Sequence, residues 1–218
     1  MFFFSIRCAL VGVLLLSTTA ACTKYEYVPD ITPIPARPII DATAEFHNLF
    51  PARALVSGKE SFGLTGSDAK RVPPQVLTDQ LEEELLEAFD QAGVFTKITK
   101  FDQHPDLILT GRINALYEHY RPQIWTKIPY MPYLETVANF LNMKTHVSTG
   151  EADLTLFVLK KNGELVGKYR GESSFKEKFN PTGEVAPGAR LNRALTEAVQ
   201  QIQEKILHDA QLRKIASR

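Results

Sequence analysis

The chain has 218 residues, of which 44% are hydrophobic and 23% charged, with 25 basic against 25 acidic side chains. This length and composition describe an ordinary globular chain with room for one core or two small ones. The neutral balance, without a Lys/Arg cluster, argues against a nucleic-acid binder, because neutralising phosphates requires a basic face.

The first 21 residues predict a removable export signal. A short start that carries Arg7 precedes an apolar run over residues 8–16, and small residues fill positions 17–21 before Cys22. The apolar run is too short to cross a hydrocarbon layer of ~30 Å, which takes about 20 apolar residues. We therefore expect no permanent transmembrane anchor in this segment.

The sequence Ala20-Ala21-Cys22 resembles the lipobox of bacterial lipoproteins, with Thr19 where that family usually has an aliphatic residue. The resemblance implies that Cys22 becomes the mature N-terminus and carries acyl chains that hold the protein on a membrane. Thr23 follows the cysteine, and in the enterobacterial sorting pattern a residue other than Asp there implies the outer membrane, facing the periplasm. The alternative is a soluble secreted protein whose signal ends near a cysteine.

Cysteine usage agrees with acylation. Cys8 would leave with the signal, so Cys22 would be the only cysteine of the mature chain and no intramolecular disulfide could form.

Residues 22–51 are predicted to form the lipidated cysteine and a proline-rich tether. Prolines at this density disfavour helices and strand pairing and favour an extended spacer of ~3.1 Å per residue. The alternative is an arm packed along the domain surface through Ile34, Ile39 and Ile40. The four prolines are Pro29, Pro33, Pro35 and Pro38.

Residues 52–212 are predicted to form one α+β domain, and residues 213–218 a polar tail. A first strand is expected within residues 52–64, and a helix from Pro73-Pro74 to a C-cap at Gly93. A second strand follows over residues 94–101. The clearest alternation then comes at residues 107–118, with Leu107, Leu109, Gly111, Ile113, Ala115 and Tyr117 on one face and Thr110, Arg112, Asn114 and Glu118 on the other.

Residues 151–172 predict a hairpin with a type I′ turn at Asn162-Gly163, which pairs Lys161 with Glu164, Thr155 with Arg170 and Leu156 with Tyr169. From about Gly188 the 3.6-residue period predicts a C-terminal amphipathic helix. The expected fold is therefore α+β, a mostly antiparallel sheet of four to five strands with two main amphipathic helices on one face.

The stretch Asp106-Leu107-Ile108-Leu109-Thr110-Gly111-Arg112-Ile113 resembles a motif strand of several envelope lipoproteins. These are the curli-secretion lipoprotein, the penicillin-binding-protein activator lipoprotein and the amino-terminal domain of the Tol-Pal periplasmic protein. The resemblance covers about residues 52–210 and implies a non-enzymatic domain that assembles with other envelope proteins. No binding residue transfers by motif.

The sequence contains no nucleophile elbow, phosphate loop or zinc-binding helix motif. The five histidines are scattered, and His119 and His146 could meet only if their strands were adjacent, which would still leave a metal without a third ligand. We therefore expect no catalytic residue, no metal and no cofactor, although a hydrolase assembled by the fold stays open.

Residues 120–143 form an unusually long, aromatic and Met-rich connection between strands. Connections are normally short and polar, so this one suggests a partner surface or a membrane contact, because aromatic and Met side chains are enriched at protein interfaces and Trp and Tyr also suit the membrane headgroup layer. The alternative is a short helix capping the core, with the aromatic side chains beneath it. The candidate contact residues are Trp125, Tyr130, Met131, Tyr133 and Phe140.

Together these patterns predict a lipoprotein acylated at Cys22 that serves as a non-enzymatic accessory or assembly subunit of a cell-envelope complex. The expected partners are the membrane, through the acyl chains, and another envelope protein. The alternative function is a periplasm-facing carrier in which the sheet and residues 120–143 enclose an apolar or lipid ligand.

Overall fold

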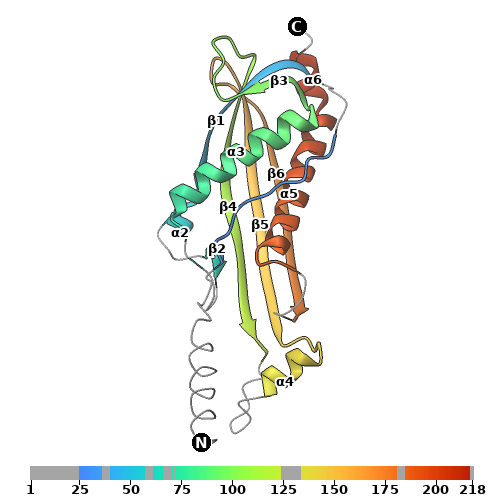
Figure 1. Cartoon of the computed structure of the whole chain (residues 1–218). Coiled ribbons are helices and arrows are strands. Elements are labelled where there is room, and N and C mark those ends of the chain that lie inside the picture. The colour runs from blue at the N-terminus through green and yellow to red at the C-terminus, as the bar shows by residue number, and fades with distance from the viewer. Residues whose placement is uncertain are drawn as a thin grey trace, which may run out of the picture.

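The computed structural model describes residues 25–35, 40–56, 61–65, 70, 72–123, 134–180 and 185–216. Strands and helices succeed each other in one mixed α/β unit (Figure 1). In chain order the elements are β1 (Ile40–Pro51), α2 (Arg53–Val56), β2 (Phe62–Thr65), α3 (Pro74–Ala92), β3 (Phe95–Thr99), β4 (Leu107–Pro122), α4 (Leu134–Phe140), β5 (His146–Lys160), β6 (Leu165–Phe179), α5 (Ala189–His208) and α6 (Ala210–Ala216).

The sheet has six strands in the order β3-β1-β4-β5-β6, with β2 also paired to β4. The antiparallel pairings of β4 with β5 and of β5 with β6 run along almost the whole of these strands, whereas β1, β2 and β3 add shorter parallel pairings. The sheet is thus mostly antiparallel, as expected, but the expected four or five strands undercount it.

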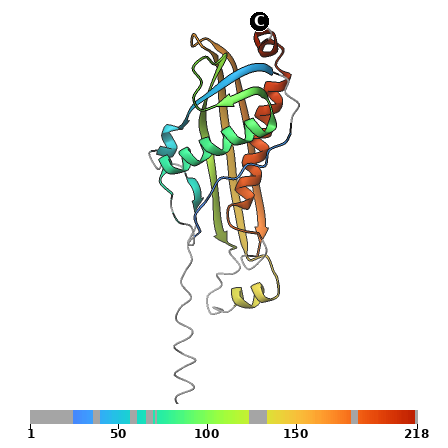
Figure 2. The ribbon, with the colours of Figure 1, turned by 45° about the horizontal axis from the view of Figure 1, so that its top comes forward.

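Helices α3 and α5 cover the same face of the sheet (Figures 1 and 2), whereas the expected two main helices leave out the short helices α2, α4 and α6. Helix α3 has Pro at its first position and ends at Gly93, whose φ of 66° is the left-handed C-cap conformation that glycine adopts easily. Their apolar faces join one core with β1, β4 and β5, which includes Phe46, Leu81, Phe89, Leu109, Leu156, Leu195 and Ile202. No helix of the described residues lies on the opposite face of the sheet.

The proline-rich N-terminal segment differs from the predicted tether of residues 22–51. Residues 40–51 form β1, which lies between β3 and β4 in the sheet. Residues 25–35 lie in the groove between α3 and α5, where Tyr27 is 1% and Ile31 6% exposed. The packed-arm alternative describes residues 25–35 better, although Ile34 is half exposed and residue 39 lies outside the described part of the chain.

Two local predictions also need correction. The strand expected within residues 52–64 is the short helix α2 followed by β2 at residues 62–65. The hairpin has a three-residue connection in place of a type I′ turn, because Gly163 N–H donates to Lys160 O and only Gly163, at φ 83°, has a positive φ. A bulge between Val158 and Leu159 then restores the predicted pairs Thr155–Arg170 and Leu156–Tyr169.

Candidate functional site

One end of the sheet carries an exposed apolar helix. We call this region the α4 end: α4, residues 141–145, and the adjoining ends of β4 and β5. Thr145 Oγ1 donates to Asn139 Oδ1 at 2.6 Å and Ala138 is buried, which fixes α4 on the strand ends. The outer surface of the α4 end exposes Val137 (55%) and Phe140 (89%) of the helix and, just after it, Leu141 (62%) and Met143 (47%).

Basic side chains surround this apolar surface. Arg121 lies at the end of β4, Lys144 lies two residues before β5 begins, and Lys178 pairs in register with Val147 near the end of β6; all three are exposed. Among the acidic residues nearby, Glu177 is already held by Arg190 and Arg193, and α4 itself carries one acidic residue, Glu135. The α4 end therefore combines exposed apolar side chains with positive charge.

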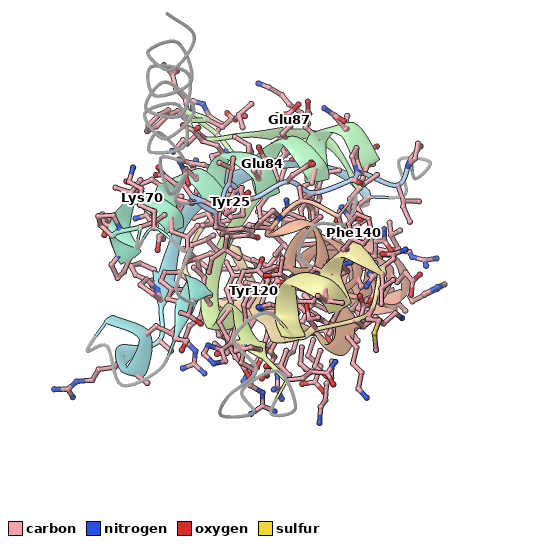
Figure 3. The ribbon with its side chains drawn as sticks, turned by 60° about the horizontal axis from the view of Figure 1, so that its bottom comes forward. Tyr25, Lys70, Glu84, Glu87, Tyr120 and Phe140 are labelled. Atoms are coloured by element: carbon pink, nitrogen blue, oxygen red, sulfur yellow. The ribbon has the colours of Figure 1, made fainter. Side chains whose placement is uncertain are left out.

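The N-terminal arm begins at the same end of the molecule. Lys70 N–H donates to Tyr25 O at 2.8 Å, and Lys70 Nζ lies 2.6 Å from Glu26 Oε2. Two residues on, Tyr27 packs against Gly188, whose N–H donates to the Tyr120 hydroxyl at 2.9 Å. Figure 3, which brings this end forward, shows Tyr25, Lys70, Tyr120 and Phe140 in one view.

A buried ionic network lies between the arm and the α4 end. Glu118 is fully buried, accepts a hydrogen bond from Ser148 Oγ at 2.5 Å, and its Oε1 lies 3.9 Å from Arg190 Nη1. Burial raises the pKa of Glu118, and the Ser148 hydrogen bond and the Arg190 charge only partly oppose that shift. Because Arg190 is the second residue of α5, this network fixes the start of α5 on β4 and β5.

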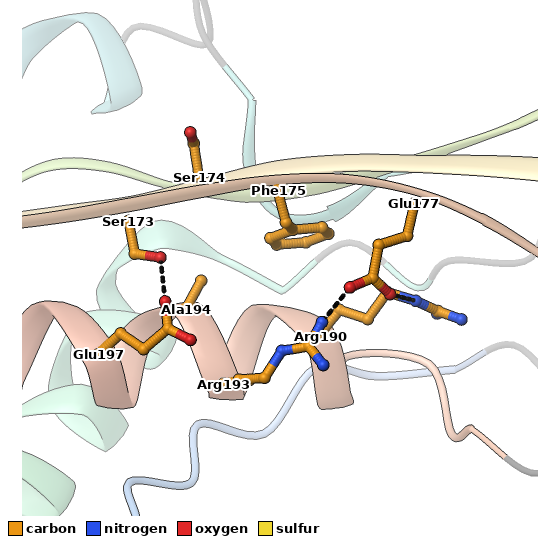
Figure 4. Close-up of a pocket in the computed structure, with 8 residues that line it drawn as sticks. All are labelled: Ser173, Ser174, Phe175, Glu177, Arg190, Arg193, Ala194 and Glu197. Carbon is orange, nitrogen blue, oxygen red and sulfur yellow. Dashed lines mark hydrogen bonds and ion pairs between the residues drawn. The ribbon is translucent and has the colours of Figure 1, made fainter.

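Beside this network, β6 and α5 border a groove of about 350 Å³ (Figure 4). Its polar side chains pair across it: Ser173 Oγ donates to Glu197 Oε2 at 2.6 Å, and Arg190 Nε donates to Glu177 Oε2 at 3.0 Å. The Arg190 guanidinium also lies 4.3 Å from the centroid of the Phe179 ring. These contacts tie β6 to α5.

The uncovered face of the sheet is polar at its centre. Arg170 donates two hydrogen bonds to the carboxylate of Asp153, at 2.9 and 2.7 Å, and Asn114 Nδ2 donates to the same carboxylate at 3.0 Å. Burial alone would raise the pKa of Asp153, but the hydrogen bonds from Arg170 and Asn114 lower it. A shallow cavity of about 670 Å³ extends from this cluster toward His119.

The described residues show neither a metal centre nor a membrane-spanning helix. No three His, Cys, Asp or Glu side chains of this part of the chain lie close enough together to hold an ion. None of its helices is both long and apolar enough to cross a bilayer.

The structure describes one of the six candidate residues of the sequence. Phe140 lies on α4, and it is the most exposed of the large apolar side chains that we describe, at 89%. Cys22, Trp125, Tyr130, Met131 and Tyr133 lie outside the described residues.

Sequence reasoning missed the buried network because it assigned Glu118 to the exposed face of its strand. The register shifts between Ile113 and Ala115, which gives β4 a bulge, and one extra residue moves every later side chain to the opposite face. Leu116 and Glu118 are therefore buried, whereas Ala115 and Tyr117 turn toward the uncovered face. The burial of Arg190 could not be predicted from the sequence, which shows only that this residue lies in the first turn of a helix.

Comparison with known proteins gives no family for the chain. No family model matches the sequence, and no curated protein matches it. Solved structures that superpose on it include XCC0632 of Xanthomonas campestris, a DUF330 protein (16% identity, TM-score 0.44, 85% of this chain and 92% of that one). Others are a candidate lipoprotein of Caulobacter crescentus (17%, 0.34, 63% and 82%) and lipoprotein GNA1162 of Neisseria meningitidis (11%, 0.25, 75% and 99%).

Proposed function

We propose that the protein is a membrane-anchored envelope lipoprotein, acylated at Cys22, and that it acts as a non-enzymatic accessory subunit of a cell-envelope complex at the outer membrane. The observation that carries the proposal is the sequence Ala20-Ala21-Cys22 at the end of an export signal. The geometry of the arm supports it, because Tyr25, three residues after Cys22, is already held on the domain by Lys70.

The sheet supports an accessory role. Its uncovered face runs along β4, β5 and β6 and combines the half-buried Phe157 with the exposed Arg112 and Lys168. A mixed apolar and charged surface of this kind suits a protein partner, because non-obligate interfaces as a whole are about as polar as the rest of a protein surface.

Among the described residues no specific observation favours the alternative of an apolar-ligand carrier, and residues 124–133, most of the segment expected to close over the ligand, lie outside them. Phe46, Phe89 and Leu116 fill the space between the helices and the sheet. Charged and hydroxyl side chains predominate around the groove of Figure 4, which would not suit an apolar ligand.

The anchor is tested by replacing each cysteine in turn. In Gram-negative cells fed an alkyne-bearing fatty acid, the wild-type protein should incorporate the label and fractionate with membranes, whereas Cys22→Ser should do neither. Cys8→Ala is the matched control, because Cys8 lies inside the export signal and its removal should leave labelling unchanged. Labelling of Cys22→Ser, or its retention in washed membranes, would refute the acyl anchor.

The accessory role is tested by photo-crosslinking in the same cells. A probe at Arg112, on the uncovered face, should capture one defined envelope protein. A probe at Glu204, exposed on the helical side of the molecule, is the control and should not capture it. Silence at Arg112, or identical products from both positions, would contradict a partner on the uncovered face.

A further inference from the structure

The chain length between the acylated cysteine and the folded domain limits where the domain can stand. Only Thr23 and Lys24 separate Cys22 from Tyr25, and three extended residues span at most about 10 Å. Because Tyr25 is hydrogen-bonded to Lys70, the acyl chains would hold this end of the domain directly at the bilayer surface.

A chain of contacts connects the anchored end to α4. Tyr27 packs on Gly188, which donates to Tyr120, and Tyr120 lies two residues before the end of β4. At that end Gln123 N–H donates to Thr145 O, and Thr145 in turn holds Asn139 of α4. The start of the described arm and the α4 end are thus connected through contacts at one end of the sheet.

We propose that the α4 end docks on the bilayer that carries the acyl chains, with Phe140 and Leu141 in the headgroup layer and Lys144, Arg121 and Lys178 facing anionic lipid phosphates. The inference rests on the proposed acylation of Cys22. Apolar side chains flanked by basic ones are the combination that binds membrane surfaces, because the apolar groups leave water while the cations remain near the phosphates.

The basic side chains of the α4 end and the short segment between Cys22 and Tyr25 favour a bilayer over a protein as the binding partner of this surface. The exposed apolar side chains that the structure describes here lie on α4 and the three residues after it, and they form a small surface, which is sufficient beside an acyl anchor that already confines the domain to the membrane. A protein partner on α4 is therefore an outcome that the experiment must be able to detect.

The test places one fluorophore at each end of the molecule. Acylation occupies Cys22, so Phe140→Cys and, separately, Phe101→Cys provide the only free thiol for an environment-sensitive dye in the full acylated protein. Phe101 is the matched control, because it is 84% exposed and lies between β3 and β4, at the end of the sheet opposite α4. The labelled proteins are reconstituted into vesicles of 70% phosphatidylcholine and 30% phosphatidylglycerol.

We expect the dye at residue 140 to shift its emission to shorter wavelength and to be quenched by lipids that carry a nitroxide near the headgroup, while the dye at residue 101 keeps the emission it has in water. Lys144→Glu combined with Lys178→Glu should reduce the quenching in anionic vesicles and leave it unchanged in pure phosphatidylcholine. The four side chains that these variants replace are all exposed, namely Phe101, Phe140, Lys144 and Lys178. Thermal unfolding of each variant should therefore match that of the wild type.

Each other outcome has a distinct meaning. Water-like emission at residue 140 in acylated protein that floats with the vesicles would refute docking by α4 and leave the proposed function intact. Protein that is neither acylated nor vesicle-bound would refute both. A photo-crosslinking probe at Phe140 that captures one protein in cells, in place of lipid, would also overturn the inference.

Discussion

Glu118 and Arg190 form an ion pair that is almost completely withdrawn from water, with side chains 0% and 5% exposed and Oε1 and Nη1 3.9 Å apart. Within the described residues, Glu118 Oε2 and Arg190 Nη1 have no hydrogen-bond partner. A buried pair of this kind contributes little net stability, but removing one member leaves an uncompensated charge in the core. The pair thus fixes the position of α5 on the sheet, but it leaves two buried polar atoms without a hydrogen bond from the described part of the chain.

The two members should respond unequally to substitution. Arg190→Met leaves Glu118 buried without its cation and should lower the free energy of unfolding by about 3–5 kcal/mol. Glu118→Gln keeps the Ser148 hydrogen bond and leaves Arg190 paired with Glu177, so about 1–2 kcal/mol should be lost. Urea unfolding measures both values, and equal losses would contradict this account of the pair.

Glu118 and Asp153 should give opposite pH dependences. The raised pKa of folded Glu118 means that its contribution to stability is full below the unfolded value near 4.5 and is lost as pH rises through the folded pKa. The lowered pKa of folded Asp153 means that its contribution is present above the unfolded value near 3.8 and is lost as pH falls through the folded pKa.

Unfolding from pH 3 to 8 tests this pair of signs. The stability difference between wild type and Glu118→Gln should shrink as pH rises, whereas that between wild type and Asp153→Asn should grow. Two differences that moved in the same direction would show that one of these carboxyl environments is described wrongly.

The arm should contribute to stability through the ring of Tyr27 and not through its hydroxyl. The ring is 1% exposed, and the hydroxyl has no hydrogen-bond partner among the described residues. Tyr27→Phe should be neutral or stabilising by up to about 1–2 kcal/mol, because it removes an unsatisfied buried polar group. Tyr27→Ala should cost about 3–5 kcal/mol. A thermal melt compares the two, and a harmless Tyr27→Ala would mean that the arm is not packed.

Gly171 should tolerate no side chain. A Cβ there would lie 1.8 Å from the carbonyl oxygen of Ala198 on α5. Gly171→Ala should therefore displace α5 and lower stability by several kcal/mol, since backbone cannot move aside as a side chain can. Gly163→Ala is the matched control: only its φ of 83° opposes alanine, and about 1–2 kcal/mol should be lost. Equal effects would contradict the close contact.

Local hydrophobic periodicity correctly predicted those elements in which the same face is buried along the whole length. Helix α3, from Pro74 to the cap at Gly93, and α5, which starts after Gly188, follow from 3.6-residue patterns with matching end signals. The central hairpin pairs Thr155 with Arg170 as predicted, because one buried face fixes the register even though the turn type differs.

The segment that forms strand β1 was wrongly predicted to belong to the tether because of the proline-rich residues that precede it. Its buried residues Ile40, Ala42, Ala44 and Phe46 alternate as a half-buried strand should, but the segment follows four prolines and was assigned to the tether with them. Its parallel partners β3 and β4 lie more than 50 residues further along the chain, so no local sequence pattern indicates the pairing.

The amino-acid sequence alone predicts the export signal and the acylation motif at Cys22, and it indicates the alternation of helices and strands, because these patterns depend on residues close together in the chain. The burial of Glu118 follows from the packed sheet and not from local sequence, since a single bulge in β4 reverses the side chains beyond it. The position of Tyr25 on the domain at the α4 end also depends on tertiary packing, because the groove between α3 and α5 that receives the arm exists only after the helices pack on the sheet.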